Sequence, residues 1–160
     1  MFVLGIDPGL STTGYGLVAG SHPPRALRAG VIRTDKDLSV AQRLAELHDG
    51  LTRVISDTSP DVIAMETVFT NRNLQTAMSV GRASGVALLV AAEAGCEVYE
   101  YVPTVVKSAV TGDGSANKDQ VQQMVARLLR LSDAPKPADA ADALAIALCH
   151  LRAAPLGANA

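Results

Sequence analysis

The chain has 160 residues, of which 48% are hydrophobic and 19% are charged, and its formal net charge at pH 7 is −2. This length favours a single domain, and this composition excludes an intrinsically disordered chain. The net charge does not exclude a nucleic-acid partner, because assigning four of the 16 acidic residues to metal ions would leave 14 basic residues against 12.

The cellular setting can be predicted from the cysteines and the apolar segments. Cys96 and Cys149 stand in apolar surroundings and form neither a disulfide framework nor a zinc motif, so we interpret them as reduced thiols. Residues 1–5 lack the basic leader and long apolar centre of a signal peptide. The most apolar stretch, residues 85–94, is about half as long as a membrane span. We therefore expect a cytoplasmic protein without a membrane partner.

Three strands are predicted at the start of the chain. Residues 2–7 form a short apolar run that ends at Pro8 and Gly9, which is typical of a buried strand followed by a turn. Residues 13–20 and 26–34 alternate apolar residues with small or polar ones, and we expect them to form two antiparallel strands after the first.

A helix and a second set of elements follow. Ser39 and Gln42 have the spacing of a capping box, and an apolar helical face continues from them to Ser59 and Pro60. The later predicted elements are a strand at 61–68, a helix at 71–94, a strand at 96–102, and helices at 104–110, 117–131 and 138–153. This order predicts an α/β fold with a five-stranded mixed sheet, three antiparallel strands followed by parallel ones, and helices on both faces. We expect one domain over residues 1–153 and a flexible tail over residues 154–160.

Four carboxylates interrupt segments that otherwise have the pattern of a buried core. Asp7 precedes a proline, so its backbone is extended and its carboxylate should project from the end of the first strand. Glu66 ends an apolar run, where a lone buried carboxylate would cost several kcal/mol. Asp139 and Asp142 are three residues apart and share one face of an alanine-rich helix. If the two strands are neighbours, all four side chains can meet.

Such a cluster predicts a divalent-metal site. Oxygen ligands without accompanying cysteine or histidine favour Mg²⁺ or Mn²⁺, and two such ions held close together are suited to phosphodiester hydrolysis. Simpler interpretations remain open at this point. Asp139 can cap its helix, Asp142 can face solvent, and Asp7 can be a turn carboxylate.

Four further residues are candidates for contacts with nucleic acid. Lys107 and Lys118 can hold phosphate groups, and Lys118 falls in the first turn of a predicted helix after a glycine-containing loop. Phe69 and Arg72 follow the Glu66 strand directly, so the aromatic ring can stack on an unpaired base. Solvated lysines and a packing role for the phenylalanine are the alternatives.

Together these motifs resemble a known family. In order and spacing from residue 2 to about residue 152, the chain is similar to RuvC, the family of bacterial Holliday junction resolvases. The matching segments are LGIDPGLSTTGYG at 4–16, METVF at 65–69, Lys107, GSANK at 114–118 and ADAADALAIA at 138–147. The resemblance implies an RNase H-like fold with Asp7, Glu66, Asp139 and Asp142 as a catalytic, metal-binding tetrad. It also implies that Lys107 and Lys118 assist catalysis or phosphate binding, and that the loop from Phe69 to Arg72 engages the centre of the junction.

The resemblance also implies an oligomeric state, a reaction and protein partners. Such enzymes are homodimers that nick two strands of like polarity in a four-way junction and leave 5′-phosphate and 3′-hydroxyl ends for ligation. They act in recombination and repair with the branch-migration proteins RuvA and RuvB. The predicted long helix that contains Gly81 and Gly85 is our candidate for the dimer contact.

Two other function classes stay open. The Gly-Ile-Asp-Pro-Gly motif at residues 5–9 also resembles the first phosphate loop of the sugar kinase, actin and Hsp70 class of ATP-binding domains, although a second nucleotide-binding half is missing. A junction-binding module without catalysis is the third possibility, and it is favoured if the acids do not converge.

Overall fold

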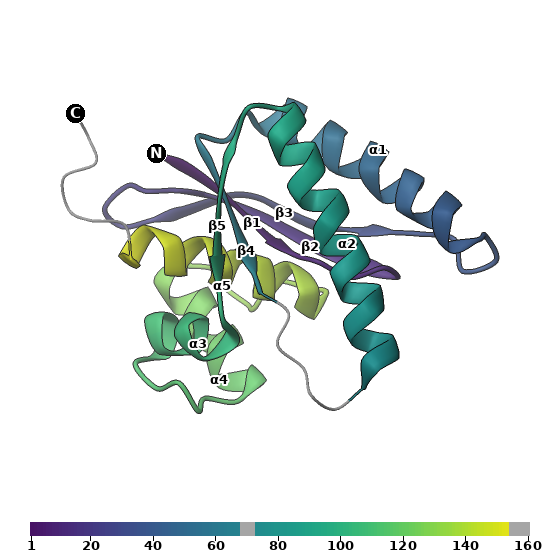
Figure 1. Ribbon diagram of the computed structural model, residues 1–160. Coiled ribbons are helices and arrows are strands. Elements are labelled where there is room, and N and C mark those ends of the chain that lie inside the picture. Colours follow the sequence, from purple (N-terminus) through teal and green to yellow (C-terminus); the bar gives the residue numbers. More distant parts are fainter. Residues whose placement is uncertain (68–72, 154–160) are drawn as a thin grey trace.

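A five-stranded mixed sheet forms the centre of the structure, in the order β3-β2-β1-β4-β5 (Figure 1). The computed structural model describes residues 1–67 and 73–153. β1 (Phe2–Asp7), β2 (Thr12–Ala19) and β3 (Arg25–Arg33) are antiparallel to one another, whereas β4 (Val62–Glu66) is parallel to β1 and β5 (Glu97–Tyr101) is parallel to β4. The predicted arrangement of three antiparallel strands followed by parallel ones is confirmed.

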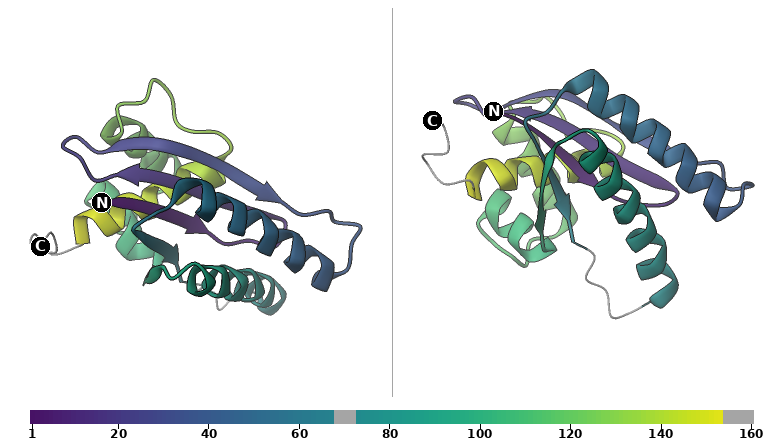
Figure 2. Two further views of the ribbon diagram at one scale, coloured as in Figure 1. Left: turned by 90° about the horizontal axis from the view of Figure 1, so that it is seen from above. Right: turned by 45° about the horizontal axis from the view of Figure 1, so that its top comes forward.

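Helices cover both faces of the sheet, as predicted (Figures 1 and 2). α1 (Val40–Thr58) and α2 (Leu74–Glu93) lie on one face, and α3 (Pro103–Thr111), α4 (Lys118–Leu128) and α5 (Ala138–Ala153) lie on the other. Successive residues of β1 point to opposite faces, so Leu4 and Ile6 join the core under α1 and α2, whereas Val3 joins the core under α5.

Two predicted helix ends needed correction. The helix predicted from residue 71 begins at Leu74, because the Asn73 side chain accepts hydrogen bonds from the N–H groups of Gln75 and Thr76 and caps it. The helix predicted to run to residue 131 ends at Leu128. Arg130 there adopts a left-handed conformation with φ of 54°, and Leu131 N–H donates back to the Ala126 carbonyl, which closes the helix. The predicted tail at 154–160 lies outside the described residues.

α5 lies directly against the backbone of β1 and β2. A Cβ atom on Gly5 would overlap the carbonyl oxygen of Ala143, and one on Gly14 would overlap the carbonyl oxygen of Asp139. Only glycine allows this close approach, and the small alanines Ala140, Ala143 and Ala147 complete it from the helix side. This packing fixes where the acidic first turn of α5 sits relative to the strands.

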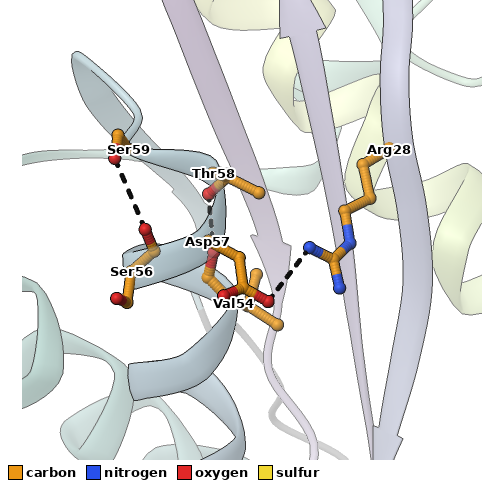
Figure 3. A network of polar contacts seen from close by, with 6 residues as sticks. All are labelled: Arg28, Val54, Ser56, Asp57, Thr58 and Ser59. Carbon is orange, nitrogen blue, oxygen red and sulfur yellow. Dashed lines mark hydrogen bonds and ion pairs between the residues drawn. The ribbon is translucent and has the colours of Figure 1, made fainter.

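On the face of the sheet opposite α5, a polar contact joins the edge strand β3 to α1. Arg28 on the edge strand β3 forms an ion pair with Asp57 of α1 at 3.3 Å (Figure 3). In the last turn of that helix, the Thr58 hydroxyl donates to the Val54 carbonyl, and Ser59 ends the helix in a left-handed conformation. The predicted end of α1 at Ser59 is confirmed.

α2 differs from the other helices in its exposed apolar surface. Among the described residues, it is the one helix whose length and composition alone would suffice to cross a membrane, and 22% of its apolar window is buried. This finding is weak evidence for a span, because the core helix of a soluble protein passes the same test.

Candidate active site

Two of the predicted carboxylates end neighbouring strands. The parallel register aligns Ile6 of β1 with Met65 of β4, so the next residue of each strand, Asp7 and Glu66, lies at the same carboxyl edge of the sheet. Four of the six residues of β1 are buried, which keeps this edge fixed. The order of the strands therefore brings together two acids that are far apart in the sequence.

The other two carboxylates reach this edge from α5. One carboxylate oxygen from each of Asp7, Asp139 and Asp142 lies within 4.8 Å of the others. Asp142 has a side chain only 21% exposed, so its interpretation as a solvent-facing residue is wrong. Asp139 lies inside the first turn of a helix that begins at Ala138, so it is not the residue that caps that helix.

Glu66 lines one cavity together with Asp7 and Asp142 of this three-residue cluster. The cavity has a volume of about 340 Å³, and its polar lining consists of Asp7, Glu66, Asp142, Lys107 and Lys118. The structure thus places all four predicted acids at one site, with three of them in a tight group. Their roles as metal ligands and catalytic residues stay a prediction.

The buried carboxylates oppose one another's ionisation. Burial, followed by repulsion from Glu66, Asp142 and Asp139, raises the pKa of Asp7 from 3.8 to about 7. The pKa of Glu66 is raised, first by burial and then by Asp142. Burial also raises the pKa of Asp142 and outweighs the opposite effect of Lys118. The site holds more negative charge than its lysines compensate, which is the electrostatic condition that a divalent cation would relieve.

The two predicted lysines approach the acids from α3 and α4. Lys118 Nζ lies 3.2 Å from Asp142 Oδ2, and this carboxylate is the main reason that the pKa of Lys118 is raised. Lys118 is the first residue of α4, and Asn117 and Gln120 form a capping box that fixes this end of the helix. Lys107 lines the cavity from α3, and its charge acts to lower the pKa of Glu66.

The predicted DNA-contacting loop cannot be placed. Phe69 and Arg72 lie outside the described residues, as does Val68 at the predicted end of the strand. Their roles stay predictions.

One buried polar pair, between β5 and the last turn of α5, was not predicted from the sequence. Tyr101 Oη lies 2.7 Å from His150 Nδ1, and His150 is only 4% exposed, so burial lowers the pKa of the imidazole. The available signal was a histidine on the otherwise apolar face of α5, since a buried imidazole needs a hydrogen-bond partner.

Comparisons with known proteins agree on one family. The sequence profile of the family described as crossover junction endodeoxyribonuclease RuvC matches residues 3–150. The protein of that name from Natranaerobius thermophilus is 46% identical over 154 residues, which cover 96% of each chain. The one from Thermomicrobium roseum is 48% identical over 152 residues, covering 95% of this chain and 93% of the relative.

Solved structures give the same result. Thermus thermophilus RuvC superposes with a TM-score of 0.88 at 39% identity, covering 95% of this chain and 94% of that one. The same protein in complex with a Holliday junction substrate gives 0.88 at 41% identity, with coverages of 94% and 92%. A yeast mitochondrial Holliday junction resolvase, at 17% identity and a TM-score of 0.65 over 94% of this chain and 78% of that one, shares the fold. The RNase H-like fold is confirmed, and the match of the profile over 148 consecutive positions, residues 3–150, shows that the chain belongs to the RuvC family of crossover junction endodeoxyribonucleases.

Proposed function

We propose that this protein resolves four-way DNA junctions by metal-dependent hydrolysis of phosphodiester bonds. In this proposal it nicks two strands of like polarity and leaves 5′-phosphate and 3′-hydroxyl ends that ligase can seal. The observation that carries the proposal is the grouping of Asp7, Asp139 and Asp142 within 4.8 Å, with Glu66 and two lysines around the same cavity. Family membership supports the choice of substrate, since a relative's structure is described as a complex with a Holliday junction.

The donor set fits divalent cations that prefer oxygen. Asp7, Asp139, Asp142 and Glu66 would hold Mg²⁺ or Mn²⁺, because among the described residues the cavity lining contains no histidine or cysteine. Two ions bound there would activate a water molecule and stabilise the oxygen that leaves the phosphodiester. The raised pKa of Asp7 supports this fit, because burial has left a carboxylate without enough positive charge around it.

In this proposal, side chains other than the four carboxylates bind the DNA and offset the negative charge at the cavity. Lys118 stays charged beside Asp142 and offsets negative charge at the cavity, and Lys107 lies close enough to hold a phosphate oxygen. Phe69 would stack on a base at the junction centre and Arg72 would contact its backbone, as the family resemblance implies.

We also propose that the protein is a homodimer joined through α2. Five of the exposed positions of this helix recur every three or four residues and form one stripe, Leu74, Met78, Gly81, Gly85 and Leu88. Leu74 is 82% exposed and Met78 is 55% exposed, which is unusual for apolar side chains unless a partner covers them. Apart from the adjacent residues and backbone of the helix itself, no atom of the described residues lies within 4 Å of a Cβ atom built on either glycine, so a second helix can approach closely here. A two-fold dimer would match the symmetry of a four-way junction.

The remaining parts of the proposal follow from the family. We propose one nuclease domain over residues 1–153, a cytoplasmic location where the DNA lies, and cooperation with RuvA and RuvB in recombination and repair. Neither of the alternatives, an ATP-binding domain or a non-catalytic module, is supported by the comparisons.

The proposal is tested with a labelled four-way junction and a linear duplex of the same sequence, each with and without Mg²⁺ or Mn²⁺. We expect the junction to be converted into paired nicked duplexes only when metal is present. Asp7→Asn and Glu66→Gln should still bind the junction but cut it at least a thousandfold more slowly, about 4 kcal/mol of transition-state stabilisation. Unchanged cleavage by both variants, or equal cutting of the linear duplex, would contradict the proposal. ATP hydrolysis measured in parallel tests the kinase-like alternative.

A further inference from the structure

A second polar cavity lies on the same side of the molecule as the carboxylate site. Its walls are the turn between β1 and β2 and the N-terminal parts of α1 and α2 (Figure 1). The cavity has a volume of about 520 Å³, and its polar lining consists of Ser11, Thr12, Arg43, Gln75, Thr76 and Ser79. None of these residues is acidic, in contrast to the neighbouring carboxylate site.

Arg43 is held in a fixed orientation at this cavity. Its Nε donates to the Thr34 hydroxyl at 3.0 Å, and its Nη2 donates to the Ser11 hydroxyl at 2.9 Å. Thr34 is only 7% exposed and its hydroxyl donates in turn to the Leu10 carbonyl, so the support of the guanidinium is itself fixed. Two of the five N–H donors of the arginine are used in this way, and within residues 1–67 and 73–153 the other three have no hydrogen-bond partner and can serve a ligand.

The charge of Arg43 is not compensated by the surrounding protein. Its contacts are with neutral hydroxyl groups, and within residues 1–67 and 73–153 it forms no ion pair with a carboxylate. The first turn of α2, which forms another wall, contains no acidic residue, so the positive end of that helix adds to the same potential. A planar guanidinium with free donors in an acid-free cavity has the chemistry that recognises a phosphate group.

The cavity is within reach of the DNA strand that would be cut. Ser11 is four residues after Asp7, so their Cα atoms are at most about 14 Å apart. The guanidinium of Arg43 donates to the Ser11 hydroxyl at 2.9 Å, so it lies near the end of β1 that carries Asp7. We propose that Arg43, oriented by Ser11 and Thr34, binds a backbone phosphate of the junction strand near the scissile bond. This inference rests on the proposed function and adds a binding residue outside the predicted set.

The test is junction binding measured by fluorescence anisotropy in EDTA, where no strand is cut, over a range of salt concentrations. We expect Arg43→Gln to weaken binding about tenfold and to make the slope of log K against log salt shallower by about 0.9, the loss of one phosphate contact. Arg53→Gln is the matched control, because it removes the same charge from an exposed position about 15 Å further along α1. It should bind with native affinity and slope.

A second variant separates loss of binding from loss of folding. Gln75→Glu places a carboxylate in the cavity with almost no change in shape and leaves the hydrogen bonds of Arg43 intact. A negative charge in the first turn of α2 favours the helix, so the variant should keep its thermal stability while binding the junction about tenfold more weakly.

The outcomes distinguish this inference from the proposed function. Weaker binding by both cavity variants, with native binding by Arg53→Gln, supports it. Native affinity of either cavity variant, or an equal loss in Arg53→Gln, overturns it while leaving the proposed function in place. If the unsubstituted protein did not bind the junction, the proposed function and this inference would both fail.

Discussion

Gly14 and Asp139 are in contact across the interface between β2 and α5, and a Cβ atom on the glycine would overlap the carbonyl oxygen of the aspartate. Gly14 is also paired with Asp7 in the register of β1 and β2. One glycine therefore fixes the distance between two of the clustered carboxylates. Asp139 is close to Asp7 only because α5 packs directly against the sheet at Gly14.

We expect Gly14→Ala to damage the site more than the fold. The added methyl group should push the first turn of α5 outward and cost about 1–3 kcal/mol of unfolding free energy, as overpacking commonly does. Junction cleavage should fall at least tenfold, because Asp139 and Asp142 both move away from Asp7. Urea unfolding and single-turnover cleavage at a temperature where the variant is folded measure the two effects. Native cleavage by a fully folded Gly14→Ala would show that this contact does not position the acids.

The raised pKa of Asp7 predicts an unusual pH dependence of stability. Between pH 3.8, the ordinary pKa of the group, and about 7, its value in the folded protein, the folded state keeps a proton that the unfolded chain loses. Stability of the metal-free protein should therefore fall as the pH rises through this range, by an amount that approaches about 4 kcal/mol. Asp7→Asn cannot ionise and should escape this loss.

The measurement is chemical unfolding of the native protein and Asp7→Asn in EDTA from pH 4 to pH 8. We expect the variant to be similar to the native protein near pH 4 and clearly more stable at pH 8. Added Mg²⁺ should narrow the gap at pH 8, because it stabilises only a protein that binds it. A stability difference that does not change with pH would contradict the shifted pKa.

Lys118 should matter for catalysis far more than for stability. Its side chain is 72% exposed, so its 3.2 Å ion pair with Asp142 is screened by water and contributes under about 1 kcal/mol. Lys118→Met should therefore unfold at nearly the native denaturant concentration, yet cut the junction at least a hundredfold more slowly. Arg127→Met, in the last turn of the same helix, serves as a control for the loss of one charge and should cut normally. Equal cleavage by Lys118→Met and the control would remove the lysine from the mechanism.

Tyr101 is expected to show the opposite behaviour. Its hydroxyl is the partner of the buried His150, so Tyr101→Phe should leave the imidazole unsatisfied and cost about 1–3 kcal/mol of unfolding free energy. The neighbouring strand residue Glu66 should stay in place, because β4 and β5 are joined by backbone pairing rather than by this hydroxyl. Cleavage at low temperature should therefore remain native. A large loss of activity without a loss of stability would assign Tyr101 a role in the site.

The sequence patterns were sufficient to predict the order of the helices and strands and to identify the four acids. They were not sufficient to predict how the helices pack against the sheet. Asp7 and Glu66 were recognisable because carboxylates are costly in apolar strands, and their meeting required only that β1 and β4 be neighbours. The contact of Gly14 with α5 and the pairing of Tyr101 with His150 join residues more than 45 positions apart. Local periodicity does not show which segment far away in the sequence packs against a glycine. It also does not show which side chain forms a hydrogen bond with a buried histidine.

The last prediction concerns the stripe on α2. Apart from the adjacent residues and backbone of α2 itself, no atom of the described residues lies within 4 Å of a Cβ atom built on Gly81, so Gly81→Leu starts its new side chain in open space on the single protomer. Any disturbance must then come from a second copy, and we expect the variant to sediment as a monomer at concentrations where the native protein is a dimer. Ala45→Leu, at an exposed position of α1, adds the same side chain away from the stripe and should stay dimeric. A monomeric Gly81→Leu should also lose the coordinated nicking of two strands while still making single nicks, because each carboxylate site lies within one chain. A dimeric Gly81→Leu would move the subunit contact away from this face of the helix.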